Sequence, residues 1–265
     1  MEKTGVRGQK RRCSSVHCLL PTAYCLLLTV FLLLTGCAWT KGAVKGGNPA
    51  SLYTEGERLY QKGQYSSAAD KLKTVMEEYP LSQEANDAQL LLADTYYSNE
   101  QYEDGASYYT NFVGLHPGHP KAPYAQFQKG MSYFKQVLTI DRDQTATKKA
   151  LLAFQDLVAS YPKSVYADRA KEMIAFLRRR LAEREFYIGS FYFKDKNYRG
   201  ALARFAEVLK TYPDVGLADK ALYYIGESYR KLGEKDLARE AFSTLVSNFP
   251  NSPFARDARG RLERI

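Results

Sequence analysis

The sequence predicts an all-α protein, a helical solenoid of five helix pairs closed by a C-terminal capping helix. Three observations predict this fold. Apolar residues recur at helical spacing in two runs per segment. The same positions recur in five segments along the chain, and each segment ends at a proline, which lacks the amide proton that a continuing helix needs. Recurring helix pairs are typical of solenoids, where neighbouring pairs share one continuous core.

Each segment has a small residue on its first helix and a large apolar residue on its second. The small residues are Gly56, Ala93, Gly130, Gly189 and Gly226. The large residues are Leu72, Tyr109, Phe154, Phe205 and Phe242. The closing prolines are Pro80, Pro117, Pro162, Pro213 and Pro250. Because a residue with little or no side chain permits close backbone approach, we expect the two helices of each pair to pack tightly at this residue.

The third segment contains extra residues between Tyr133 and Ala150. They include residues 139–143, which we expect to form an exposed loop between the paired helices. Asp141 and Asp143 in this loop could suggest a metal site. The remaining ligands of a calcium-binding loop are missing, so a surface loop is the better interpretation.

A longer spacing separates the third and fourth segments. Residues 166–193 contain no helix breaker and have apolar residues at helical intervals, which predicts one long connecting helix. The expected organisation is therefore N-terminal repeats one to three over residues 51–165, and C-terminal repeats four and five over residues 166–265. Residues 252–265 are amphipathic and predict the capping helix that covers the last pair.

The first residues of the chain have the parts of an export signal. Basic residues precede an apolar run, which ends at Leu-Thr-Gly-Cys37. A membrane-spanning anchor is the alternative, but the run is interrupted by Pro21 and is shorter than the ~20 residues that a span needs. The last four residues of this segment resemble the bacterial lipobox. We therefore predict a lipoprotein signal peptide over residues 1–36, lipidation of Cys37 and a flexible tether over residues 37–50.

The composition gives little indication of catalysis or of nucleic-acid binding. The formal net charge is +9, but part of it lies in the predicted signal peptide and the rest is spread along the helices. The sequence has no glycine-rich phosphate loop, no Gly-x-Ser-x-Gly and no His-Glu-x-x-His. His116 and His119 lie in a proline-bounded turn with no cysteine or nearby carboxylate. We therefore expect a protein that is not an enzyme and that has no catalytic residues, metal or cofactor.

The repeated positions resemble the tetratricopeptide repeat. More specific features lie in residues 131–133, 141–144 and 149–154 of the third segment, and in residues 185–187 and 191–192 of the connecting helix. Together with the lipobox, they resemble the BamD family of outer-membrane lipoproteins, the tetratricopeptide subunits of the β-barrel assembly machinery.

This resemblance implies a scaffold anchored by lipid to the periplasmic face of the outer membrane. Its implied partners are the BamA-like insertase, other assembly lipoproteins and unfolded outer-membrane proteins, the last bound by the N-terminal repeats. The family's insertase contact includes an arginine on the second helix of the fourth unit, which corresponds to Arg204 here. Arg178 and Arg179 on the connecting helix are further candidate contacts, although such residues are ordinarily part of a solvated face. Tyr97 and Tyr108, beside repeat positions, are candidates that could face a groove.

A second resemblance leaves an alternative open. Residues 221–229 and 249–253 fit the general repeat closely and are similar to the periplasmic repeat protein of the Tol–Pal system. That reading implies a role in envelope maintenance and cell division. Cys37 and the absence of a heptad stretch favour the assembly family.

Overall fold

The computed structural model of the chain describes residues 48–265, which contain eleven α-helices and no strand. The helices are α2 (Pro49–Gln61), α3 (Tyr65–Glu78), α4 (Gln83–Ser98), α5 (Tyr102–Leu115), α6 (Ala122–Phe134), α7 (Thr145–Ser160), α8 (Ala167–Lys194), α9 (Tyr198–Thr211), α10 (Ala218–Leu232), α11 (Lys235–Asn248) and α12 (Pro253–Leu262). The predicted signal peptide, the lipidation site Cys37 and most of the predicted tether lie outside the described residues.

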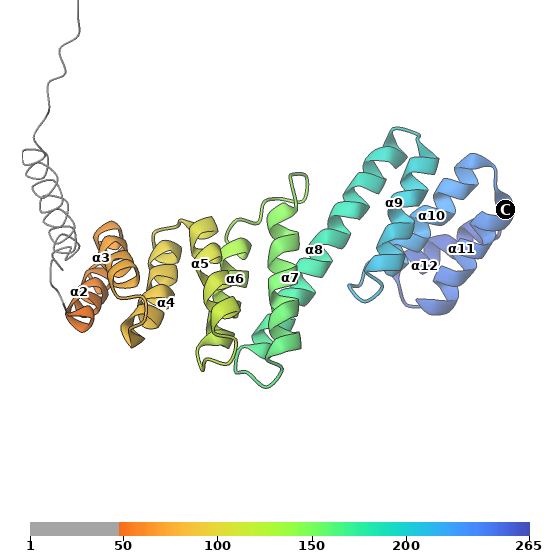
Figure 1. Cartoon of the computed structure of the whole chain (residues 1–265). Coiled ribbons are helices and arrows are strands. Elements are labelled where there is room, and N and C mark those ends of the chain that lie inside the picture. The colour runs from red at the N-terminus through yellow and green to blue at the C-terminus, as the bar shows by residue number, and fades with distance from the viewer. Residues whose placement is uncertain (1–47) are drawn as a thin grey trace, which may run out of the picture. The chain divides into compact units, whose positions relative to one another are not determined.

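The five predicted helix pairs are confirmed as α2–α3, α4–α5, α6–α7, α8–α9 and α10–α11, and α12 is the predicted cap. Each helix packs against the helix before it and the helix after it in the chain, so successive helices lie side by side (Figure 1). This sequential packing of helix pairs is the architecture of a tetratricopeptide-type solenoid.

The first helix begins earlier than predicted. Asn48 caps α2, because its side-chain oxygen accepts a hydrogen bond from the amide of Ala50 at 3.0 Å. Proline is well tolerated in the first turn of a helix, where its missing amide proton is not needed. Pro49 and Ala50, assigned to the tether from the sequence, therefore belong to α2.

The close approach predicted at the small residues is confirmed, and its partner is the large residue of the same pair. A Cβ atom added to Gly130 or Gly226 would lie 2.6 Å from the ring of Phe154 or Phe242, respectively. At Gly189 the ring of Phe205 would be 2.7 Å away. A fully buried phenylalanine ring thus lies directly against a glycine backbone in units three, four and five.

Unit two reaches the same packing by a different route. Its first helix has Ala93 at the small position, and the second helix has Gly105 where the other units have alanine. A Cβ atom at Gly105 would lie 3.3 Å from the backbone nitrogen of Tyr97 and 3.4 Å from the carbonyl oxygen of Ala93. Part of the room for close approach therefore comes from the second helix.

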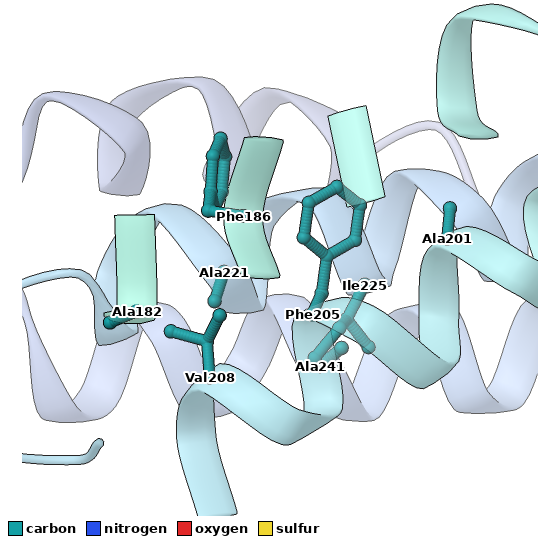
Figure 2. Close-up of a cluster of buried hydrophobic side chains, with 8 residues drawn as sticks. All are labelled: Ala182, Phe186, Ala201, Phe205, Val208, Ala221, Ile225 and Ala241. Atoms are coloured by element: carbon teal, nitrogen blue, oxygen red, sulfur yellow. The ribbon is translucent and has the colours of Figure 1, made fainter. Parts of the chain in front are cut away.

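Helix α8 confirms the predicted connecting helix and belongs to two hydrophobic cores. Its first half packs through Ala170 and Leu177 with Phe154 of α7. Its second half packs through Ala182 and Phe186 with α9 and α10, and Figure 2 shows these side chains together with Phe205, Val208 and Ile225. The predicted boundary between residues 165 and 166 lies just before α8, and this helix joins the two halves by packing against both.

The loop of the third unit is shorter than the insertion. Residues 135–144 join α6 to α7, whereas residues 145–149 extend α7 by more than a turn. The side-chain nitrogen of Gln144 closes the loop by donating to the carbonyl oxygens of Thr139 and Arg142, at 2.9 and 3.0 Å. Arg180 and Arg184 of α8 donate to the carbonyl oxygens of Leu138 and Ile140. The loop is therefore bound to the connecting helix.

The C-terminal cap is fixed by a buried carboxylate. Glu227 of α10 is only 6% exposed and forms ion pairs with Arg230 on its own helix and Arg261 on α12, each at 2.8 Å. A buried carboxylate is costly unless it is paired, so two guanidinium groups offset the desolvation of Glu227. This arrangement joins α12 to α10.

The glycine–phenylalanine contact gives a prediction about stability. We expect Gly226→Val to lower the free energy of unfolding by about 1–3 kcal/mol, because the new side chain overlaps the buried ring of Phe242. Gly260 on α12 is the matched control, since a Cβ atom there would have no atom within 4 Å. Gly260→Ala should stabilise the helix by about 0.5–1 kcal/mol. Urea unfolding followed by circular dichroism measures both, and equal stability of Gly226→Val and wild type would contradict the packing argument.

Candidate partner-binding surfaces

The two histidines singled out in the sequence have structural roles. The rings of His116 and His119 each lie 5.3 Å from the ring of Phe112. The Nδ1 atom of His119 also accepts a hydrogen bond from the amide of Lys121 at 3.1 Å. Within residues 48–265, no group of three or more His, Cys, Asp or Glu side chains is arranged to hold a metal ion. The surfaces that remain to be considered are those that can bind a partner.

Arg204 lies on α9 at the exposed edge of the α8–α9 pair. Its Nη1 atom donates to Glu185 of α8 at 3.0 Å, and 43% of the arginine side chain is exposed. Exposed ion pairs contribute little to stability, at most about 1 kcal/mol. The pair holds Arg204 in position and leaves much of its guanidinium group open to solvent.

Arg178 is occupied within the chain. Its Nη2 atom donates to Asp214 at 2.6 Å and to the carbonyl oxygen of Thr211 at 3.2 Å, and its guanidinium lies 5.7 Å from the centre of the Tyr212 ring. The hydrogen bond from Arg178 is the main cause that lowers the pKa of Asp214 below its ordinary value. These contacts join α8 to the end of α9. Arg178 stays a predicted partner contact, but its geometry favours an internal role.

Arg179 borders an exposed hollow on α8. Its Nε atom pairs with Glu183 at 3.0 Å, and both side chains line a hollow of about 430 Å³ together with Tyr187 and Lys220. The Lys220 ammonium lies 4.3 Å from the centre of the Phe186 ring, which forms part of the floor. We call this hollow the α8 groove.

Two exposed aromatic residues beside the α8 groove were not among the predicted contacts. Tyr187 is 48% exposed and Phe191 is 61% exposed, one turn apart on α8. The spacing of Glu183, Tyr187 and Phe191 marks one face of a helix. The sequence alone does not show that no neighbouring helix covers this face.

The tyrosine candidates of unit two are engaged in packing. The ring of Tyr97 meets the edge of the Tyr102 ring, with centroids 5.5 Å apart. Tyr108 stacks on Tyr96 at 5.2 Å, and the ammonium of Lys73 lies over Tyr96. Burial is the main cause that raises the pKa of both Tyr97 and Tyr108. Each is half-buried, so only part of either ring is available to a partner.

A carboxylate that the sequence did not single out joins three helices in this half. Asp94 of α4 accepts hydrogen bonds from the hydroxyl groups of Tyr109 on α5, at 2.5 Å, and Tyr124 on α6, at 2.8 Å. Burial raises the pKa of Asp94 above its ordinary value, against the two hydrogen bonds, which favour the charged form. This network fixes units two and three against each other.

Comparisons with known proteins place this architecture. Residues 46–242 match the YfiO family, described as outer membrane lipoprotein. A protein of Rickettsia prowazekii named "Outer membrane protein assembly factor BamD" is 33% identical over 227 residues, which are 85% of this chain and 90% of the relative. A protein of the same name from Caulobacter vibrioides is 31% identical over 78% of this chain and 68% of its own length.

Among solved structures, the TPR2AB domain of yeast Sti1 is 15% identical, covers 81% of this chain and 83% of its own, and has a TM-score of 0.41. No argument is based on that similarity. None of the helices between Asn48 and Ile265 has the length and hydropathy that a membrane span requires. The family match and the two relatives cover both halves of the solenoid and α8 between them. The chain belongs to the BamD family of outer-membrane lipoproteins.

Proposed function

We propose that the protein is a lipid-anchored periplasmic scaffold for the assembly of outer-membrane proteins. In this role it binds a BamA-like insertase and unfolded outer-membrane proteins, together with other assembly lipoproteins. The observation that carries the proposal is the 33% identity with an outer membrane protein assembly factor across 90% of that relative's length. The same match favours assembly over the Tol–Pal alternative.

The α8–α9 face of units four and five is the proposed contact for the insertase. It combines the exposed arginines Arg204 and Arg179 with the exposed aromatic residues Tyr187 and Phe191. Arginine and aromatic residues are enriched among the side chains that dominate protein–protein binding energy. Because the arginines present positive charge at the edge of this face, an acidic patch on the insertase is the expected complement.

Units one to three are the proposed contact for unfolded substrate. Two partners bound at opposite ends of the solenoid need a fixed distance between them. Helix α8, 28 residues long and packed into both cores, supplies that rigid connection. The insertase and the substrate can then be held by one scaffold without competing for the same helices.

The proposed anchor is Cys37, acylated after removal of the signal peptide. More than one acyl chain is needed for stable anchoring, since each buried methylene contributes only about 0.8 kcal/mol. We predict that Cys37→Ser moves the protein from the membrane pellet to the soluble periplasmic fraction. Immunoblotting of both fractions after a salt wash measures the change. A variant that stays in the pellet would show that the cysteine is not the anchor.

Reversing the charge of Arg204 tests the insertase contact. We expect Arg204→Glu to reduce recovery of the insertase in an affinity pull-down from solubilised outer membrane by about 10-fold, the equivalent of about 1.4 kcal/mol. This change also places a like charge beside Glu185, so it alters the chain internally.

The double variant Arg204→Glu with Glu185→Arg is the matched control. It restores the internal ion pair with the charges exchanged, while the charge offered at position 204 stays reversed. Recovery of the insertase by the double variant would show that Arg204 acts only within the chain. Recovery of Tol or Pal components without the insertase, by the wild type, would contradict the assembly function.

A further inference from the structure

Units one and two leave a groove between their second helices, α3 and α5. Two adjoining hollows of about 610 and 330 Å³ share Met76, Gln89 and Leu115 in their walls. The N-terminal part of α4 forms the floor between them, and Figure 1 shows these three helices next to one another. We call this region the Gln89 groove, lined by Met76, Asn86, Gln89, Asn111, Gly114 and Leu115.

Gln89 is a buried carboxamide without a partner. Its residue is 7% exposed, and its side chain has no hydrogen bond to any residue between Asn48 and Ile265. Gln126 occupies the same position in the next repeat, four residues before the small residue, and donates from Nε2 to the carbonyl oxygen of Ala153 at 2.9 Å. A buried polar group usually has a partner, because leaving it unpaired weakens the folded state. The unpaired amide of Gln89 faces the groove and is available to a ligand.

The walls of the Gln89 groove are neutral. None of the residues that line the two hollows is Asp, Glu, Lys or Arg. Asn86 and Asn111 add two further carboxamides that have no hydrogen bond to other described residues. Met76 and Leu115 supply apolar surface, and Leu115 is 70% exposed. A charged segment would lose hydration here without gaining an ion pair, so the walls favour an uncharged ligand.

A carboxamide matches the main chain of a peptide in an extended conformation. It offers both a donor and an acceptor, as each peptide group does, and it pairs without regard to sequence. Apolar side chains that alternate with polar ones lie on one side of an extended segment. The strands of outer-membrane barrels have this alternation.

We propose that the Gln89 groove binds extended, uncharged strand segments of unfolded outer-membrane proteins. Gln89 pairs with the main chain of the segment, and Met76 and Leu115 contact its apolar side chains. This inference rests on the proposed function and names the substrate class and the site. It is independent of the insertase contact, which lies on α8 and α9.

Gly114 offers a way to close the groove without disturbing the fold. It lines the larger hollow, and a Cβ atom built on it would have no atom within 4 Å. A leucine at this position would therefore extend into the groove instead of into the protein. Leucine also favours a helix over glycine, so the variant should fold at least as well as the wild type.

The test uses the full lipidated chain in detergent and two probes. One is a fluorescent peptide with blocked ends and alternating valine and threonine; the other is a urea-unfolded porin diluted into buffer. We expect Gly114→Leu and Gln89→Leu each to weaken peptide binding by about 10-fold or more, with an unchanged or higher melting temperature. Gly260→Leu is the matched control, since Gly260 also has open space around its Cβ position and lies on α12. It should bind the peptide as the wild type does.

The outcomes separate the groove from the wider function. Equal peptide affinity in the wild type, Gly114→Leu and Gln89→Leu would overturn the groove. So would a change of oligomeric state in Gly114→Leu by light scattering, because the groove would then be a contact between two copies. Binding of porin but not of peptide by the wild type would also overturn the groove and leave the proposed function standing. Failure of the wild type to bind either probe would contradict substrate binding as a whole.

Discussion

The contact of a small residue with a large ring sets the distance between the helices of a pair. In units three to five a glycine of the first helix lies directly under a phenylalanine of the second, with no room for a Cβ atom. Protein interiors are close-packed, so this distance cannot relax without loss of contacts elsewhere. Because each pair also packs on the next, the same short distance is repeated along the solenoid and determines where surface residues such as Arg204 and Gln89 lie.

Helix α8 turns this repeated packing into a scaffold with two ends. It takes part in the core of units three and four at once, and its arginines bind the loop of unit three and the end of α9. Three of these arginines, Arg178, Arg180 and Arg184, are used within the chain, which leaves Arg179 and Arg204 as the exposed cations of this region. The connecting helix therefore has an internal role along most of its length, and partner binding is confined to the uncovered face that includes Tyr187.

Most of the fold could be predicted from the sequence, because helix breakers and apolar periodicity are local signals. The five pairs, the long α8 and the cap all follow from them. The candidate sites could be predicted only in part. The hydrogen bonds to Asp94, the internal pairing of Arg178 and the difference between Gln89 and Gln126 depend on side chains from neighbouring helices, which no periodic pattern specifies. The start of α2 was placed two residues late because the cap at Asn48 precedes the apolar pattern.

The central claim is that one scaffold holds two partners at separate places. Hydrogen exchange of the lipidated chain in detergent, alone and with either the insertase or a urea-unfolded porin, measures this directly, since binding slows the exchange of covered and stabilised amides. The account predicts that the insertase slows exchange in α8, α9 and the start of α10, and that the porin slows it in α3, α4 and α5. Protection of the same helices by both partners would contradict the claim.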